Sequence, residues 1–156
     1  MKYLISILTI CSIALLNCSN TAQNTNGLQE TIVVDADLQK IVDTFFQKYQ
    51  SSPSESIDYI FSTNNSFTPN QLNDLKDKLQ ATINTVGNYN EAELITIKKT
   101  SASLVFFSYL VKHDKQPLRF TLMFYKPKAN WILYKFKFDD SVDAELEESG
   151  RIYFIK

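Results

Sequence analysis

Few residues in this chain have the type and spacing that chemistry requires. Its 156 residues include one histidine, His113, and two cysteines, Cys11 and Cys18. A protein zinc site needs three or four His, Cys or carboxylate ligands, and these counts do not supply a cluster. The three glycines lie far apart in the sequence, so there is no glycine-rich phosphate loop. We therefore expect neither a metal site nor a cofactor.

The residues that could act as acids or bases are also few. His113 lies in the segment Lys-His-Asp-Lys at 112–115, which we expect at the tip of a hairpin with the imidazole in solvent. A serine triad needs its histidine held by an acid inside the fold. A carboxylate base needs an apolar site near the reacting proton. Four carboxylates stand at the ends of predicted strands, where carboxylates are usually solvated: Glu91, Glu93, Asp139 and Asp140. The sequence favours a non-catalytic protein, with an acid–base enzyme as the alternative.

Aromatic residues are the more informative set, with 11 Phe, 8 Tyr and one Trp. Eleven of these 20 residues fall on predicted strands. Such side chains either pack a core or line a pocket for an apolar ligand. Both interpretations stay open. For the second, the candidate ligand-binding residues are Phe107, Tyr109, Phe124, Trp131 and Tyr134.

The first residues have the pattern of an export signal. Lys2 precedes the apolar run Leu4–Leu16, which is 13 residues long. A membrane-spanning helix needs roughly 20 apolar residues, so the run is too short to span a bilayer. A positive start followed by a short apolar run is typical of a signal peptide, which we assign to residues 1–17.

The segment Leu15-Leu16-Asn17-Cys18 resembles the lipobox of bacterial lipoproteins, in which an aliphatic residue stands three before a cysteine. The resemblance implies that Cys18 is lipidated and that the signal is cut just before it. Ser19, rather than Asp, follows the cysteine, which by the same resemblance implies the outer membrane. A plain secretory signal with an incidental cysteine is the alternative, and Cys11 is a weaker lipid site because the large Ile10 precedes it.

Composition divides the remaining chain into a tether and one domain. Residues 18–30 are polar and cannot bury enough surface to offset their ordering entropy, which predicts a flexible tether. Residues 31–156 have the length of a single domain. The formal net charge of −1 argues against a general nucleic-acid binder, which needs a basic surface.

Three helices are predicted at the start of this domain. Apolar residues from Leu38 to Tyr49 recur at helical spacing, with Asp35 or Asp37 as the cap. Ser-Pro-Ser-Glu at 52–55 and Thr-Pro-Asn-Gln at 68–71 are capping boxes with proline at the first helical position, and they predict two further helix starts. Gly87 ends the third helix.

Strands are predicted at 89–99, 102–112, 118–126 and 129–138, because these segments are rich in aromatic and β-branched residues. The short connections imply antiparallel pairing. The segment 120–125 is apolar on both faces, which predicts an interior strand. In the last strand, the alternation of apolar and charged residues predicts one buried face and one solvent-exposed face. The buried set is Ile132, Tyr134, Phe136 and Phe138. A short acidic helix at 143–149 and an extended end at 151–155 complete the prediction.

Helices followed by a meander of strands predict an α+β domain with helices on one face of a sheet of about four strands. This order resembles the NTF2-like (cystatin-like α+β) superfamily, which implies a curved antiparallel sheet around an N-terminal helical stretch. The resemblance also implies a possible pocket behind the strand aromatics. Three helices before the first strand leave a different helix-on-sheet fold open. We expect a lipid-anchored envelope protein that binds an apolar small molecule or a protein partner, with an acid–base enzyme or an immunity or inhibitor protein as alternatives.

Overall fold

The computed structural model describes residues 33–144, in which three helices precede four strands. The predicted signal peptide, Cys18, the tether, and most of the predicted acidic helix and C-terminal strand lie outside these residues. None of the helices between residues 33 and 144 is long and apolar enough to cross a membrane. The elements are α1 (Ala36–Ser51), α2 (Pro53–Phe61), α3 (Pro69–Val86), β1 (Tyr89–Ser101), β2 (Leu104–His113), β3 (Leu118–Tyr125) and β4 (Ile132–Asp139).

The helices begin at the predicted capping residues. The Asp35 carboxylate accepts the backbone N–H of Asp37 at the start of α1. Thr68 and Gln71 form a complete capping box at the start of α3, each side chain accepting the other's backbone N–H. Because these bonds satisfy backbone groups that a helix leaves free, local sequence alone determines where the helices start.

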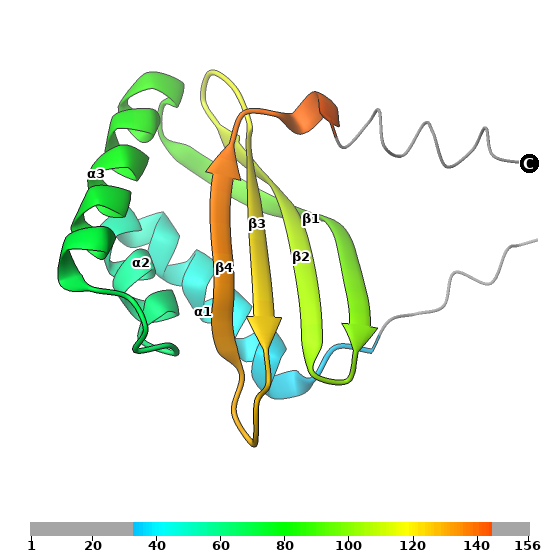
Figure 1. Ribbon diagram of the computed structural model, residues 1–156. Helices are drawn as coiled ribbons and strands as arrows, with labels where there is room; N and C mark the ends of the chain where they lie inside the picture. Colours follow the sequence, from blue (N-terminus) through cyan, green and yellow to red (C-terminus); the bar gives the residue numbers. More distant parts are fainter. Residues whose placement is uncertain (1–32, 145–156) are drawn as a thin grey trace, which may run out of the picture. The chain divides into compact units, whose positions relative to one another are not determined.

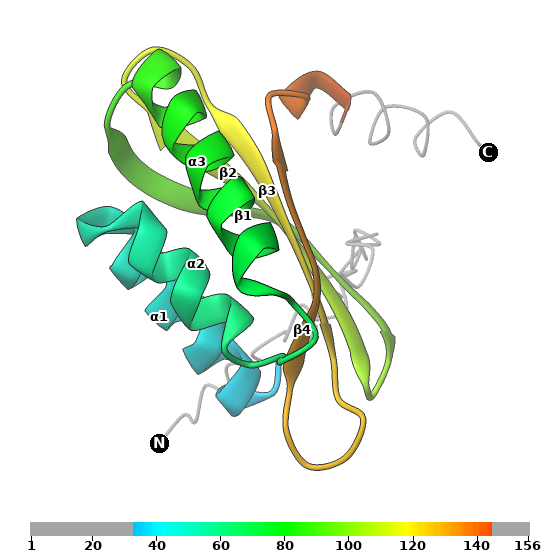
Figure 2. The same ribbon diagram turned by 60° about the vertical axis from the view of Figure 1, so that its left-hand side comes forward.

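The four strands form one antiparallel sheet in the order β1-β2-β3-β4. β3 lies between β2 and β4, as its two apolar faces predict. All three helices cover the same face of the sheet (Figures 1 and 2). The sheet is curved and not closed, so the predicted α+β architecture is confirmed.

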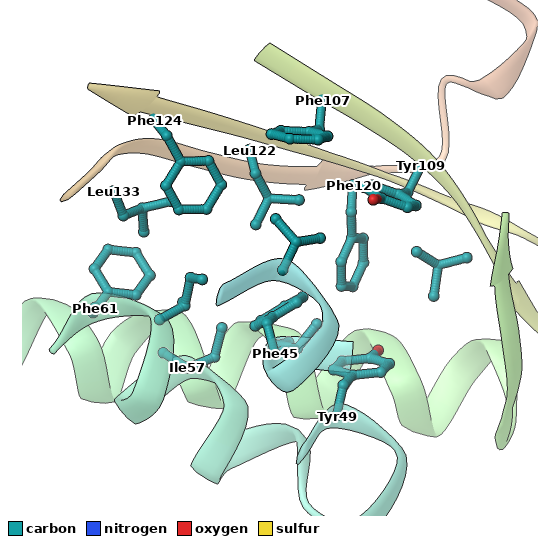
Figure 3. Close-up of a cluster of buried hydrophobic side chains, with 14 of the residues drawn as sticks. Phe45, Tyr49, Ile57, Phe61, Phe107, Tyr109, Phe120, Leu122, Phe124 and Leu133 are labelled. Carbon is teal, nitrogen blue, oxygen red and sulfur yellow. The ribbon is translucent and has the colours of Figure 1, made fainter. Parts of the chain in front are cut away.

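The core lies between the helices and the inner face of the sheet (Figure 3). Phe120 stands at its centre: its ring centroid is 5.2 Å from that of Tyr49 and 5.5 Å from that of Phe136. The ring of Phe45, like Tyr49 a residue of α1, also packs against it, with a centroid distance of 6.4 Å. All of these rings except Phe136 are fully buried, so aromatic packing joins α1 to β3 and β4.

The predicted alternation of buried and exposed residues is wrong in the first half of β4. Met123 pairs with Lys135, but the next residue, Phe124, pairs with Leu133. Tyr134 is therefore an extra residue, the signature of a β-bulge. Leu133 is fully buried while 60% of Tyr134 is exposed. A bulge reverses which alternate residues face inward, and local composition does not reveal it.

The prediction that His113 is solvated is also wrong, because it is 7% exposed at the end of β2. Its Nδ1–H donates to the carbonyl oxygen of Gly87 at 2.8 Å. With that tautomer Nε2 is an acceptor, and the Tyr49 hydroxyl donates to it across 3.3 Å. The histidine thus connects the end of β2 to α1 and to the turn after α3. The inward-facing residues of β2 alternate as far as Val111, and His113 continues that alternation.

Gly87 closes this corner with a backbone that only glycine adopts freely, at φ 94° and ψ −169°. A Cβ at this position would lie 2.8 Å from the Cβ of Asp114. The Asp114 carboxylate is itself held by the backbone N–H of Asn88 at 2.9 Å. Backbone strain and a close contact therefore both oppose any side chain at position 87.

We expect Gly87→Ala to lower the free energy of unfolding by about 1–3 kcal/mol, because of this strained conformation. Equilibrium urea unfolding followed by circular dichroism measures it. Asn73→Ala, on the exposed face of α3, is the control and should change the free energy by less than about 0.5 kcal/mol. Equal urea midpoints for Gly87→Ala and the unmodified protein would contradict the expectation.

Candidate binding site at Trp131

A pocket of about 320 Å³ opens where the start of the described chain meets the β1–β2 turn and the beginning of β4. Most of its wall is apolar, and two of its lining residues are ionisable. The lining residues are Val33, Val34, Asp35, Lys99, Ala102, Val105 and Trp131. Of the five aromatic residues predicted to bind a ligand, only Trp131 lines this pocket.

An ion pair holds one side of the pocket together. Lys126, in the loop after β3, donates to the Asp35 carboxylate at 2.9 Å. The same ammonium group lies 5.3 Å from the centroid of the Trp131 ring, within the range of a cation–π contact. Asp35 therefore has two roles, as the cap of α1 and as the residue that joins α1 to the β3–β4 loop.

The indole N–H of Trp131 is buried without a hydrogen-bond partner among the described residues. It lies close enough to Asp35 to help lower the pKa of that carboxyl, but it does not make a hydrogen bond of good geometry. A buried donor left in this state costs free energy.

Asp35 gives the site a pH dependence. The hydrogen bond from Lys126 first, and then the nearby indole N–H of Trp131, lower the pKa of Asp35 from 3.8 to about 2. A lowered pKa means that the folded state favours the charged carboxylate. The stabilisation is complete above about pH 4 and is lost as the pH falls from there through about 2.

We therefore expect the unmodified protein to be more stable than Asp35→Asn at neutral pH, with the difference shrinking below about pH 4. Thermal unfolding temperatures of both proteins across this pH range measure it. Lys126→Gln removes the main cause of the lowered pKa of Asp35. It should also reduce stability at neutral pH, and its difference from the unmodified protein should also shrink below about pH 4. A difference between Asp35→Asn and the unmodified protein that stays constant down to pH 2 would contradict this assignment.

The other predicted ligand-binding residues lie elsewhere. Phe107 and Phe124 are fully buried in the core, with ring centroids 6.0 Å apart and nearly perpendicular planes. Tyr109 packs at 4.7 Å from Phe46 on α1, and burial raises its pKa to about 12. Tyr134 is exposed at the β4 bulge. The structure thus does not bring the five side chains to one pocket.

Two further pockets lie towards the opposite end of the strands. One, of about 220 Å³, is lined by Tyr49, Tyr89 and His113 among others, and its histidine is already engaged as described above. The other, of about 350 Å³, includes Asp139 and Asp140. Neither contains a residue that the sequence predicts to bind a ligand.

The strand-end carboxylates are mostly exposed, as expected. Glu91 and Glu93 are exposed, and both pair with Lys112. Asp139 differs: it is mostly buried and pairs with Arg119 at 3.1 Å and with Lys137 at 2.7 Å. Burial raises its pKa, but these hydrogen bonds outweigh burial and lower it overall. A carboxylate kept charged in this way is a poor general base at neutral pH.

Sequence reasoning missed Asp35, Lys99 and Lys126 as neighbours of Trp131. Of these three residues, only Asp35 belongs to a recognisable sequence pattern, and that pattern predicts a helix cap. The three residues come from α1, β1 and the β3–β4 loop, so only tertiary structure places them together. Within residues 33–144, no group of three or more His, Cys, Asp or Glu side chains is placed to hold a metal ion. Comparisons with protein-family models, curated proteins and solved structures found no match to this chain.

Proposed function

We propose that this chain is an exported protein, anchored to the bacterial envelope by lipid on Cys18, whose domain binds a small apolar molecule at the Trp131 pocket. The observation that carries the binding role is the pocket itself, in which an aromatic ring and aliphatic walls surround about 320 Å³ of open space. The lipobox pattern supports the anchor. A non-catalytic envelope lipoprotein is the function that these features favour together.

The size and lining of the pocket restrict the ligand. Pockets for small molecules in proteins are roughly 300–1,000 Å³ and mostly apolar, with a few polar groups that orient the ligand. This pocket is at the small end of that range. Val105 and Trp131 supply apolar contact, while Lys99 and Asp35 supply charged groups. A compact molecule with an apolar body suits it better than a long chain.

The charges at the pocket favour binding over catalysis. Among the described residues, Asp35 is the only carboxylate in the lining, and Lys126 keeps it ionised with a pKa of about 2. A general base works best when its pKa lies near the working pH. Asp35 is therefore suited to orienting neighbouring groups and not to accepting a proton from a substrate.

Trp131 is the only tryptophan in the chain, so its fluorescence reports directly on the pocket. We expect a saturable change in Trp131 emission with at least one small aliphatic probe from the series hexanol, cyclohexanol and hexanoate. Ala102→Leu narrows the pocket and should weaken that response about tenfold or more, whereas Ala81→Leu on α3 should not alter it.

Two results would contradict the ligand role. One is the absence of any saturable response to all three probes in the unmodified protein. The other is equal affinity in Ala102→Leu and Ala81→Leu, which would place the binding outside the pocket. Both variants are compared at equal fractions folded, measured by circular dichroism.

A further inference from the structure

The meander brings two hairpins to one end of the sheet. β1 runs into β2 through the turn at 102–103, and β3 runs into β4 through the loop at 126–131. Because neighbouring strands alternate in direction, both connections lie at the same end (Figure 1). We call the segments Lys98–Leu104 and Tyr125–Lys135 the hairpin end.

The hairpin end is basic. The segments 94–110 and 120–138 contain no Asp or Glu but six lysines, five of which belong to the hairpin end. One of the five, Lys126, is partly neutralised by Asp35. The other four have exposed side chains: Lys98, Lys99, Lys128 and Lys135.

The opposite end of the sheet carries the acidic residues. Glu91 and Glu93 begin β1, Asp114 follows β2, and Asp139 ends β4. Much of the positive charge there is paired, with Lys112 bound to Glu91 and Glu93 and with Arg119 bound to Asp139. The strands thus separate charge along their length, although the formal charge of the whole chain is only −1.

Exposed aromatic and aliphatic groups lie among these lysines. Tyr125 is 41% exposed and Tyr134 is 60% exposed, and both belong to the hairpin end. Tyrosine suits a boundary between apolar and aqueous surroundings, because its ring is apolar and its hydroxyl forms hydrogen bonds. Val33, which lines the adjoining Trp131 pocket, is 77% exposed.

The chain also enters the described structure at this end. The ion pair of Asp35 with Lys126 holds the start of α1 beside the β3–β4 loop, and Figures 1 and 2 show α1 beginning there. Cys18 precedes Val33 by 15 residues. Even fully extended, such a segment spans at most about 50 Å. Lipid on Cys18 would therefore hold the start of α1 within about 50 Å of the membrane.

We infer that the hairpin end rests on an anionic lipid surface. The inference builds on the proposed anchor at Cys18, which brings the domain to the bilayer, while the lysines orient it. Lysine side chains near an anionic bilayer are attracted to lipid headgroups, and salt screens this attraction over about 10 Å at 0.1 M. The acidic end then faces away from the membrane.

The first experiment measures lipid affinity without the anchor. Residues 18–156 with Cys18→Ser retain every described element and lack both the apolar signal and the acylated thiol. We expect this protein to co-sediment with phosphatidylglycerol-containing vesicles, to bind pure phosphatidylcholine vesicles much more weakly, and to dissociate at high salt. Adding Lys99→Gln, Lys128→Gln and Lys135→Gln should weaken binding on the order of a hundredfold, at roughly fivefold per lysine.

A matched control removes the same charge elsewhere. Lys48→Gln, Lys78→Gln and Lys115→Gln alter α1, α3 and the β2–β3 turn, away from the hairpin end. This triple variant should bind phosphatidylglycerol vesicles within about threefold of the parent protein, since distant charges are screened. Similar losses in both triple variants, or no binding of the parent to anionic vesicles, would overturn the inference.

The second experiment uses the lipidated protein in vesicles. Trp131 is the sole tryptophan and lies in the hairpin end, so a headgroup spin-labelled lipid should quench its fluorescence. Quenching should fall in the Lys99, Lys128 and Lys135 triple variant and persist in the control. If lipid labelling of Cys18 succeeds but quenching is absent, the orientation is wrong and the anchor stands. If labelling fails, the proposed anchor is wrong, and the vesicle measurement still tests the surface.

Discussion

Replacing Cys18 by alanine is expected to leave the precursor unlipidated and to release or misplace the domain. The thiol is the only group at this position that can accept a thioether-linked lipid, and alanine has none. Each buried methylene contributes about 0.8 kcal/mol to membrane affinity, so losing two or more acyl chains changes a permanent attachment into a transient one. Metabolic labelling with palmitate and detergent phase partition measure the loss.

Cys11 provides the matched control. Cys11→Ala alters the predicted signal peptide but leaves the lipobox resemblance around Cys18 intact. Labelling should persist in Cys11→Ala and disappear in Cys18→Ala. If palmitate labelling survives the loss of Cys18, the anchor assignment is wrong, and a plain secretory signal becomes the better interpretation.

Phe120→Ala is expected to be the most destabilising of the core substitutions considered, by about 3–5 kcal/mol. The Phe120 ring is fully buried and contacts Phe45 and Tyr49 on α1 as well as Phe136 on β4. Its removal leaves a cavity at the junction of the two layers. Since small domains are stable by roughly 5–15 kcal/mol, this is a large part of the total.

Two further variants test whether the loss of stability comes from the cavity that Phe120→Ala leaves. Phe120→Leu keeps most of the apolar volume and should cost less than Phe120→Ala. Tyr134→Ala removes an exposed ring at the β4 bulge and should cost less than about 0.5 kcal/mol. Urea unfolding gives the loss in the free energy of unfolding for each of the three variants and so ranks them. Equal losses for Phe120→Ala and Tyr134→Ala would show that Phe120 is not central to packing.

Local sequence predicts those parts of the fold that depend on neighbours in the chain. The start of α3 follows from Thr68 and Gln71, whose mutual hydrogen bonds close within four residues. β3 is an interior strand of the sheet, as its two apolar faces predict, but only its inward face is buried, and the outward residues Arg119, Thr121 and Met123 are partly exposed. The resemblance to the NTF2-like superfamily stays a prediction.

The predictions that failed depend on residues far apart in the chain. The bulge at Tyr134 exists because β4 must match the register of β3, and composition alone does not indicate an inserted residue. His113 is buried because α1 and the turn at Gly87 supply its two hydrogen-bond partners, Tyr49 and the Gly87 carbonyl. Histidine in a short polar segment carries no sign of such partners.

The sequence by itself determined the order of helices and strands, the helix starts and the α+β architecture, because capping and alternation act over a few residues. It also supplies the segment 15–18, whose resemblance to a lipobox predicts lipid on Cys18. Only the tertiary structure decided that Trp131, Asp35 and Lys126 share one site, and that the lysines of two hairpins gather at one end. Strand pairing brings the two hairpins to one end, and the position of α1 on the sheet brings Asp35 to Lys126; both depend on residues far apart in the chain.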